Sequence, residues 1–280
     1  MTHRHWVYRD TLELVLLCRR WGMGVLASLF LCSRAVAAPE EIQVYMDELN
    51  QPGDVGLDIH NNYVLSGGSG IGYEGEQPSL HRYRLTPEWS LGLTHSLELG
   101  AYLPLATIGH GDLFVQGFKV RLKWVAPKIA GRNWFWGANF EMGREDHRLD
   151  ENPWNAELKG IVGVHSGKWT AAANANIDFK VSGPAPAPAT LEIATKLSYA
   201  ISSHTALGIE NYNGSGKIRR IGQFESSEQS TYFTADTSVG KWDLNLGLGH
   251  GYGSNSDRWI AKAIVSVPLD WSMSRYRRPQ

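Results

Sequence analysis

The chain has 280 residues, of which 27 are basic, 28 are acidic and 42% are hydrophobic. This balance argues against nucleic acid as a partner, because phosphate binding needs a basic surface. Both cysteines, Cys18 and Cys32, lie near the N-terminus. The rest of the chain therefore has no thiol for a disulfide, a thiolate metal site or a nucleophile.

The N-terminus has the features of a secretory signal peptide. A basic region ending at Arg19 and Arg20 precedes an apolar run over 21–32, and Ala35-Val36-Ala37 matches a small-residue cleavage site. The run is too short to cross a bilayer as a helix. We therefore predict a signal peptide over 1–37, with a buried N-terminal helix or a retained anchor as the alternatives.

Twelve short segments then alternate between apolar and polar residues. Strict alternation predicts strands that are apolar on one face and polar on the other. No stretch after residue 37 approaches the length of about 18 consecutive apolar residues, so membrane insertion would have to use strands. The predicted strands are 53–64, 83–93, 97–105, 114–125, 134–144, 154–165, 169–181, 190–201, 205–213, 230–239, 242–251 and 259–268.

The apolar faces have the composition of a lipid-facing wall. In the segment 114–125, apolar side chains from Phe118 to Trp124 share one face, and a cationic row from Lys119 to Lys123 shares the other. Tryptophans lie on the apolar side at the segment ends, as in the aromatic girdles of membrane barrels. The alternative is a soluble β-sandwich, in which the same rings are core aromatics. The predicted girdle consists of Trp124, Trp134, Trp136, Trp154, Trp169, Trp242 and Trp259.

The whole pattern predicts an all-β fold, a closed antiparallel transmembrane β-barrel of about 12 strands in the cell outer membrane. The connections alternate between short and long, which predicts short periplasmic turns and longer extracellular loops. We divide the chain into the signal peptide, a periplasmic lead or small plug over 38–52, the barrel over 53–269 and a basic C-terminal tail over 270–280. Pro87 and Pro104 remove ladder donors and should mark a bulge, an edge or a strand end.

The polar faces would point into the barrel lumen. Their strand positions hold ten acidic and eight basic residues, which predicts a nearly neutral lumen with weak ion selectivity. Glu98 and Glu141 should form ion pairs with the cationic row between them. These charges would bind the barrel interior together, line a polar pathway for solutes, or do both. The candidate lumen-lining residues are Asp58, His60, Arg84, Glu88, Glu98, Lys119, Arg121, Lys123, Glu141, Glu157, Lys159, Asp178, Lys180, Glu192, Lys196, Glu210, Asp236, Asp243 and Lys262.

The sequence predicts no cofactor, no metal site and no catalytic residue. His95, His165 and His204 each lie beside a serine at a short connection, and turn composition explains them better than metal binding or acid–base chemistry. Outward His250 has no outward serine on a neighbouring strand, which disfavours a lipid hydrolase.

One stretch carries a family resemblance. Glu41-Ile42-Gln43-Val44-Tyr45-Met46-Asp47-Glu48-Leu49-Asn50 and Pro52-Gly53 lead into Gly56-Leu57-Asp58-Ile59-His60-Asn61-Asn62-Tyr63-Val64. With Pro87-Glu88-Trp89-Ser90 and Gly92-Leu93-Thr94, this resembles the outer-membrane barrel family labelled as putative phenol meta-pathway proteins (MetA-pathway of phenol degradation-like). The resemblance implies a barrel associated with uptake of small organic compounds, and it transfers no catalytic residue.

We therefore expect a narrow, porin-like channel or transport-related barrel for small solutes, small organic compounds among them, and no enzymatic activity. The alternatives are a structural barrel without transport and, less favoured, an outer-membrane lipid hydrolase. The expected partners are outer-membrane lipid, lipopolysaccharide, the barrel-assembly machinery and a small-molecule solute.

Overall fold

The computed structural model describes residues 41–107, 111, 113–184, 188–218, 221–222, 227–252, 256–267 and 269. All of them belong to one compact unit of the chain, Ala35–Gln280. The signal peptide predicted over 1–37 and the basic tail predicted over 270–280 lie outside the described residues. Among the described residues, no helix combines the length and the hydropathy needed to cross a membrane.

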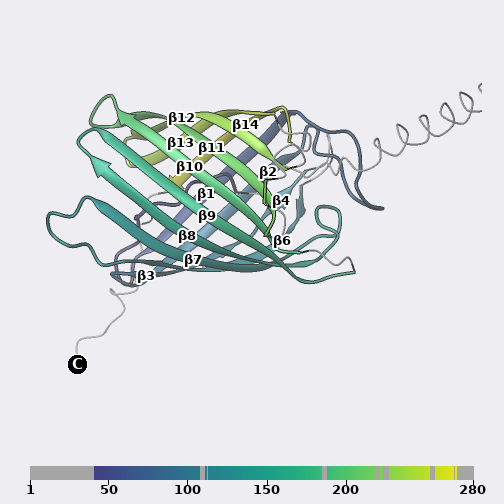
Figure 1. Cartoon of the computed structure of the whole chain (residues 1–280), viewed down its shortest axis with the longest axis horizontal. Coiled ribbons are helices and arrows are strands. Elements are labelled where there is room, and N and C mark those ends of the chain that lie inside the picture. The colour runs from purple at the N-terminus through teal and green to yellow at the C-terminus, as the bar shows by residue number, and fades with distance from the viewer. Residues whose placement is uncertain are drawn as a thin grey trace, which may run out of the picture. The chain divides into compact units, whose positions relative to one another are not determined.

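The described strands pair antiparallel in one sheet that closes on itself (Figure 1). Closure is made by β1, in which Asn61 lies opposite Ala263 of β14 on one side and opposite Leu85 of β2 on the other. The strands are β1 (Val55–Ser66), β2 (Tyr83–Thr94), β3 (Leu97–Tyr102), β4 (Leu105–Ala106), β5 (Phe114–Val115), β6 (Gly117–Val125), β7 (Trp134–Glu145), β8 (Trp154–Ser166), β9 (Trp169–Ser182), β10 (Thr190–Ala200), β11 (Thr205–Lys217), β12 (Gln229–Val239), β13 (Trp242–Gly251) and β14 (Trp259–Val267).

These elements make twelve barrel strands, because β3 with β4 and β5 with β6 are each one interrupted strand. The gap after β3 contains Pro104, which has no N–H to donate. The gap also contains Leu103, which lies opposite Pro87 of β2. The Pro87 carbonyl accepts a hydrogen bond from Leu103 N at 3.1 Å, and the position of the N–H that Pro87 lacks faces the gap as well. The predicted closed antiparallel barrel of about twelve strands is confirmed, and the two prolines together explain its interrupted strands.

The outer surface of the barrel is apolar. Large hydrophobic side chains in the middle of the strands are exposed, with Phe140 at 47%, Val162 at 55% and Phe233 at 61%. A continuous apolar exterior of this kind is a lipid-facing wall rather than the surface of a water-soluble protein. The fold therefore excludes the soluble sandwich, in which these side chains would be buried.

The predicted girdle tryptophans lie at the ends of strands. Trp134, Trp136, Trp169, Trp242 and Trp259 are all exposed. Trp124 and Trp154 are half-buried because each packs edge-on against an outward neighbour: Trp124 lies 4.9 Å from Trp136 between ring centroids, and Trp154 lies 5.8 Å from Phe118. Amphipathic rings at strand ends are typical of the two interfaces of a bilayer.

The two ends of the barrel differ in the length of their connections. Strands are joined over 95–96, 126–133, 167–168, 201–204 and 240–241 at one end, which we call the short-turn rim. The other end, the long-loop rim, carries 67–82, 107–113, 146–153, 183–189, 218–228 and 252–258. In Figure 1 the short-turn rim is at the left, and the dark-blue loop after β1 projects from the long-loop rim at the right.

One strand is longer than the alternation predicts. The segment expected to end at 213 continues to Lys217 as β11, and it stays paired with β10 through a register shift between Leu191 and Glu192. Gly214 and Gly216 have no side chains from which alternation can be recognised, so the pattern ended before the strand did.

Candidate functional site

The barrel lumen contains the segment of the chain that precedes β1. Residues 41–54, which we call the lumen segment, run from the long-loop rim towards the short-turn rim before β1 begins. Near the long-loop rim, Ile42 packs against Val64, Tyr232 and Ile260 in a small apolar cluster. Near the short-turn rim, the Asn50 backbone N donates to Glu98 Oε2 at 2.7 Å.

A tight turn connects the lumen segment to β1. Asp54 N donates to Gln51 O at 2.9 Å, and Gly53 has a φ of 88°. Pro followed by a residue with positive φ is the signature of a type II turn, and Pro52-Gly53 supplies both residues. The turn rests directly on β2, because a Cβ at Gly92 would lie 2.2 Å from the Gln51 carbonyl oxygen.

Tyr45 is the centre of the segment's contacts with the wall. Its hydroxyl lies 2.7 Å from Glu41 Oε1, 2.8 Å from the Tyr102 hydroxyl and 3.0 Å from Glu141 Oε1. Its backbone is held by the amide of Asn174 on β9, which accepts from Tyr45 N at 2.6 Å and donates to Tyr45 O at 2.9 Å. One side-chain amide thus satisfies two buried backbone groups that have no strand partner.

Two lysine side chains lie close to the Tyr45 ring. Lys159 Nζ lies 4.0 Å from the ring centroid, and Lys123 Nζ lies 5.1 Å from it. The ring itself packs in a second apolar cluster with Phe135 and Ile161. A cation–π contact that is shielded from water contributes about 2 kcal/mol. The segment is therefore held in the lumen by apolar, hydrogen-bonding and cation–π contacts at the same point.

The wall around Tyr45 is an ion-pair network. Arg121 donates to Glu88 Oε1 at 2.6 Å and to Glu98 Oε1 at 2.8 Å, and Lys119 pairs with Glu141 at 3.1 Å. The pairs Arg121–Glu98 and Lys119–Glu141 are diagonal, because the residues directly opposite Arg121 on β3 and Lys119 on β7 are the glycines Gly100 and Gly143. Glu88 lies one strand further away, on β2. The predicted ion pairs of Glu98 and Glu141 with the cationic row are confirmed.

A second network lies across the lumen. The Glu210 carboxylate forms ion pairs with Lys262 Nζ at 2.5 Å and with Lys196 Nζ at 3.2 Å. Lys196 Nζ also pairs with the Asp236 carboxylate at 2.8 Å. Lys262 Nζ donates in addition to the backbone O of Ile42 at 2.9 Å. Charges buried to this degree are tolerated only when they are paired, and here the pairing also anchors the lumen segment.

At the short-turn rim the segment is fixed by Asp47. Its carboxylate lies 3.0 Å from His165 Nε2 and 3.1 Å from Lys128 Nζ. Burial opposes ionisation of Asp47, but the hydrogen bonds from His165 and Lys128 outweigh it and hold the pKa of this carboxyl below its ordinary value. Turn composition alone does not account for His165, because its ring is a docking partner of the lumen segment.

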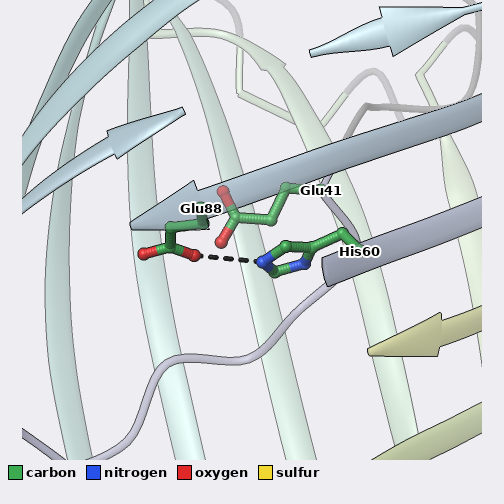
Figure 2. Close-up of side chains that lie close together, drawn as sticks. All are labelled: Glu41, His60 and Glu88. Carbon is green, nitrogen blue, oxygen red and sulfur yellow. Dashed lines mark hydrogen bonds and ion pairs between the residues drawn. The ribbon is translucent and has the colours of Figure 1, made fainter. Parts of the chain in front are cut away.

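Glu41, His60 and Glu88 converge inside the lumen (Figure 2). One ligand-type atom from each lies within 4.8 Å of the others, which is the spacing of a possible metal site. However, His60 Nε2 is already bonded to Glu88 Oε2 at 3.0 Å, and the guanidinium of Arg121 neutralises the other oxygen of Glu88. The positive charge of Arg121 beside the site disfavours a divalent cation, so we interpret the group as part of the ion-pair network.

Among the carboxyl groups of the lumen segment, Glu41 has a raised pKa. Burial, followed by the negative charge of Glu141, raises the pKa of Glu41 to about 7 from its ordinary value of 4.5. Its partners are arranged for the protonated form as well as the ionised one, because the Tyr45 hydroxyl can accept as well as donate a hydrogen bond.

The lumen segment leaves two cavities. The outer cavity, at the long-loop rim, has a volume of about 310 Å³, and the inner cavity, at the short-turn rim, has about 930 Å³. Of the predicted lumen-lining residues, the outer cavity is lined by Arg84, Lys119, Glu141, Glu157, Lys159, Asp178, Lys180 and Glu192. The inner cavity is lined by Asp58, Glu88, Glu98, Arg121, Lys123, Lys196, Glu210, Asp236 and Asp243.

The two remaining candidates, His60 and Lys262, are buried in the ion-pair networks. Strand alternation did not identify the lining residues that lie outside the strands. These are chiefly Glu41, Tyr45 and Glu48 of the lumen segment and Asp150, Glu228 and Asp257 of the long loops. For the segment itself, the sequence leaves open whether residues 38–52 form a periplasmic lead or a small plug, and it gives no contacts with the wall.

Comparisons with known proteins support the fold. No family model and no curated protein matches the chain. Among solved structures, an outer-membrane channel from Pseudomonas putida F1 matches with a TM-score of 0.55 at 15% identity, covering 81% of this chain and 99% of that one. The KdgM porin in complex with disordered oligogalacturonate matches with a TM-score of 0.52 at 10% identity, covering 76% and 99%. The NanC porin matches with a TM-score of 0.51 at 13% identity, covering 76% and 100%. The chain thus has the fold of bacterial outer-membrane porin-like barrels.

Proposed function

We propose that the protein is an outer-membrane channel for small solutes whose conductance is limited by its own lumen segment. The observation that carries this proposal is the lumen: a charged, polar interior that holds a non-covalently bound segment with a cavity on each side. A solute can enter either cavity from its rim, and passage between them requires the segment to shift. The long-loop rim would face outwards and the short-turn rim the periplasm.

The solute class follows in part from the residues that line the path. The family resemblance of the lumen segment supports small organic compounds as solutes. Polyanions such as the oligogalacturonate bound by KdgM fit poorly, because acidic side chains outnumber basic ones in both cavities. As a barrel in the outer membrane, the protein would contact lipopolysaccharide and be inserted by the barrel-assembly machinery.

An enzymatic role has little support on the outer wall. His250, the one outward histidine that drew attention there, packs against Trp259 with ring centroids 4.8 Å apart, and it lies opposite Thr231 and Trp259 on the neighbouring strands. A serine nucleophile would have to lie beside such a histidine. We therefore propose a non-enzymatic barrel.

Swelling of proteoliposomes tests the proposal. Vesicles containing the purified protein should swell in isotonic arabinose faster than protein-free vesicles, and a variant that lacks residues 41–50 should swell faster still. Swelling of both proteins at the rate of empty vesicles would contradict a channel and favour a structural barrel without transport. A chromogenic ester assay on the same preparation should show no turnover above that of a His250→Ala variant.

A further inference from the structure

The outer cavity has a surplus of acidic side chains. Nine acidic and four basic side chains line it. Three of the bases are engaged in ion pairs, since Lys119 pairs with Glu141, Lys159 with Glu157 and Lys180 with Asp150. Counting strand positions alone predicts a nearly neutral lumen, and it omits the acidic residues that the loops and the lumen segment add here.

Four of the acids form a row along the wall. Glu157 of β8 lies directly opposite Asp178 of β9, and Glu192 of β10 lies one diagonal step further along. Glu228 follows, because its backbone carbonyl accepts from Gly214 N at 2.8 Å, and Gly214 is the residue opposite Glu192. Like charges on opposite strands destabilise a sheet, so this row costs folding free energy unless a cation compensates it.

Unpaired hydrogen-bond acceptors at the same place indicate a ligand that carries hydrogen-bond donors. Asn176 is only 5% exposed and lines the outer cavity, and its Nδ2 donates to Glu192 Oε1 at 3.0 Å. Its Oδ1 has no hydrogen-bond partner among the described residues, and neither has the buried Oε1 of Glu228. Both free atoms are acceptors, and a buried acceptor without a donor is costly. A ligand that brings N–H donors and positive charge would satisfy both.

The spacing of the acids favours an organic cation over a metal ion. Among the described residues, the group Glu41, His60 and Glu88 is the only one with three such ligand atoms within 4.8 Å of one another. No three carboxylates of the acidic row therefore lie close enough together to share one metal ion. Tyr212 and Tyr232, which pack edge-on with centroids 5.6 Å apart, add an aromatic wall to the cavity. Carboxylates around an aromatic surface are the usual recognition elements for ammonium groups.

We propose that the outer cavity is a binding site for a small organic cation carrying an ammonium group, held by Glu192, Glu228 and Asn176. The site deepens the proposed function, since it names the solute class that the channel would select at its outer end. The cavity volume of about 310 Å³ suits a molecule of the size of an aromatic amine.

Calorimetric titration of the full chain in detergent tests the site with benzylammonium, its neutral analogue benzyl alcohol and the anion benzoate. Benzylammonium should bind, and neither analogue should. The double variant Glu192→Gln, Glu228→Gln should lose about tenfold or more in affinity, because the charge complementarity is removed. The control Glu74→Gln removes an exposed acid outside the cavity and should leave the affinity unchanged.

Several results would overturn the site: no binding of benzylammonium, equal binding of the three probes, or the same affinity in the double variant as in the wild type. Calcium binding that depends on the same two carboxylates, without benzylammonium binding, would also overturn it. If the double variant does not fold, competition on the wild-type protein decides: benzylammonium bound at the site should be displaced by butylammonium, which also carries N–H donors and a positive charge, and not by arabinose. Binding in detergent is independent of permeation, so failure of the site and failure of the channel, measured by arabinose swelling, are distinguishable.

Discussion

At the scale of single residues, Glu41 links the docking of the lumen segment to pH. It is surrounded by charges on the lumen wall, and burial with the negative charge of Glu141 raises its pKa to about 7. A carboxyl group whose pKa is raised in the docked state stabilises that state in its protonated form. The contribution is fully present below the ordinary value of 4.5 and is lost as the pH rises through about 7. The charged groups that act on Glu41 are Glu141, His60, Glu88 and Lys159.

The expected consequence is a channel that opens more often in mildly alkaline solution. Single-channel recordings should show more frequent openings at about pH 8 than at about pH 6. The variant Glu41→Gln cannot ionise, so its opening frequency should change much less over the same interval. An equally strong pH dependence in Glu41→Gln would assign the effect to another group.

At the scale of elements, the turn that leads the lumen segment into β1 depends on the absence of a side chain at Gly92. A Cβ there would lie 2.2 Å from Gln51 O and 2.5 Å from Asn50 O, both of which are backbone atoms that cannot rotate away. Gly92→Ala should therefore displace the turn at a cost of about 1–3 kcal/mol, and it should raise the mean conductance.

The control for this variant is Gly160→Ala. The nearest atom to a Cβ at Gly160 is Ala175 O at 4.0 Å, so this change should leave both folding and conductance as they are. Heat-modifiable migration in gels reports whether each variant still forms the barrel. A Gly92→Ala protein that is folded and has unaltered conductance would show that the turn does not hold the segment in place.

The strands could be predicted from the sequence, whereas for the segment before them the sequence leaves two alternatives open, a periplasmic lead and a small plug. The inward and outward faces of each strand can be recognised from its own sequence, because a shift of one residue would move every side chain to the opposite face. The run from Trp169 to Ser182, for example, shows its two faces without knowledge of its neighbours. Tyr45 is different, since its backbone partner Asn174 lies 129 residues away along the chain.

The same distinction separates the parts of the candidate site. Inward residues such as Arg121 and Glu98 could be assigned by alternation, and their pairing follows from the adjacency of their strands. The contributions of Glu228 and Asp257 come from loops, in which no periodicity tells which side chains turn into the barrel. The acidic character of the outer cavity therefore emerges only from the folded chain.

At the scale of the whole molecule, the account requires lipid around the apolar exterior. Phe140 lies near the middle of β7 and is 47% exposed on that exterior. Phe140→Arg should lower the free energy of unfolding in lipid vesicles by about 2–4 kcal/mol, because a cation near the bilayer midplane loses its hydration. Denaturant titrations followed by tryptophan fluorescence measure this free energy.

Val239 provides the matched position at the rim. It is 60% exposed and is the last residue of β12 at the short-turn rim, where a cation reaches the headgroups. Val239→Arg should therefore cost about 0–1 kcal/mol. Equal costs at the two positions would mean that the exterior is not embedded in a bilayer.

The most direct measurement is the single-channel conductance, in planar bilayers, of the protein that lacks residues 41–50, compared with the intact protein. These residues include Tyr45, Asp47 and Asn50, which fix the segment to the wall of the lumen. The account predicts that the shortened protein still forms the barrel and conducts severalfold more current at the same voltage. A folded, shortened barrel with the conductance of the intact protein would contradict it.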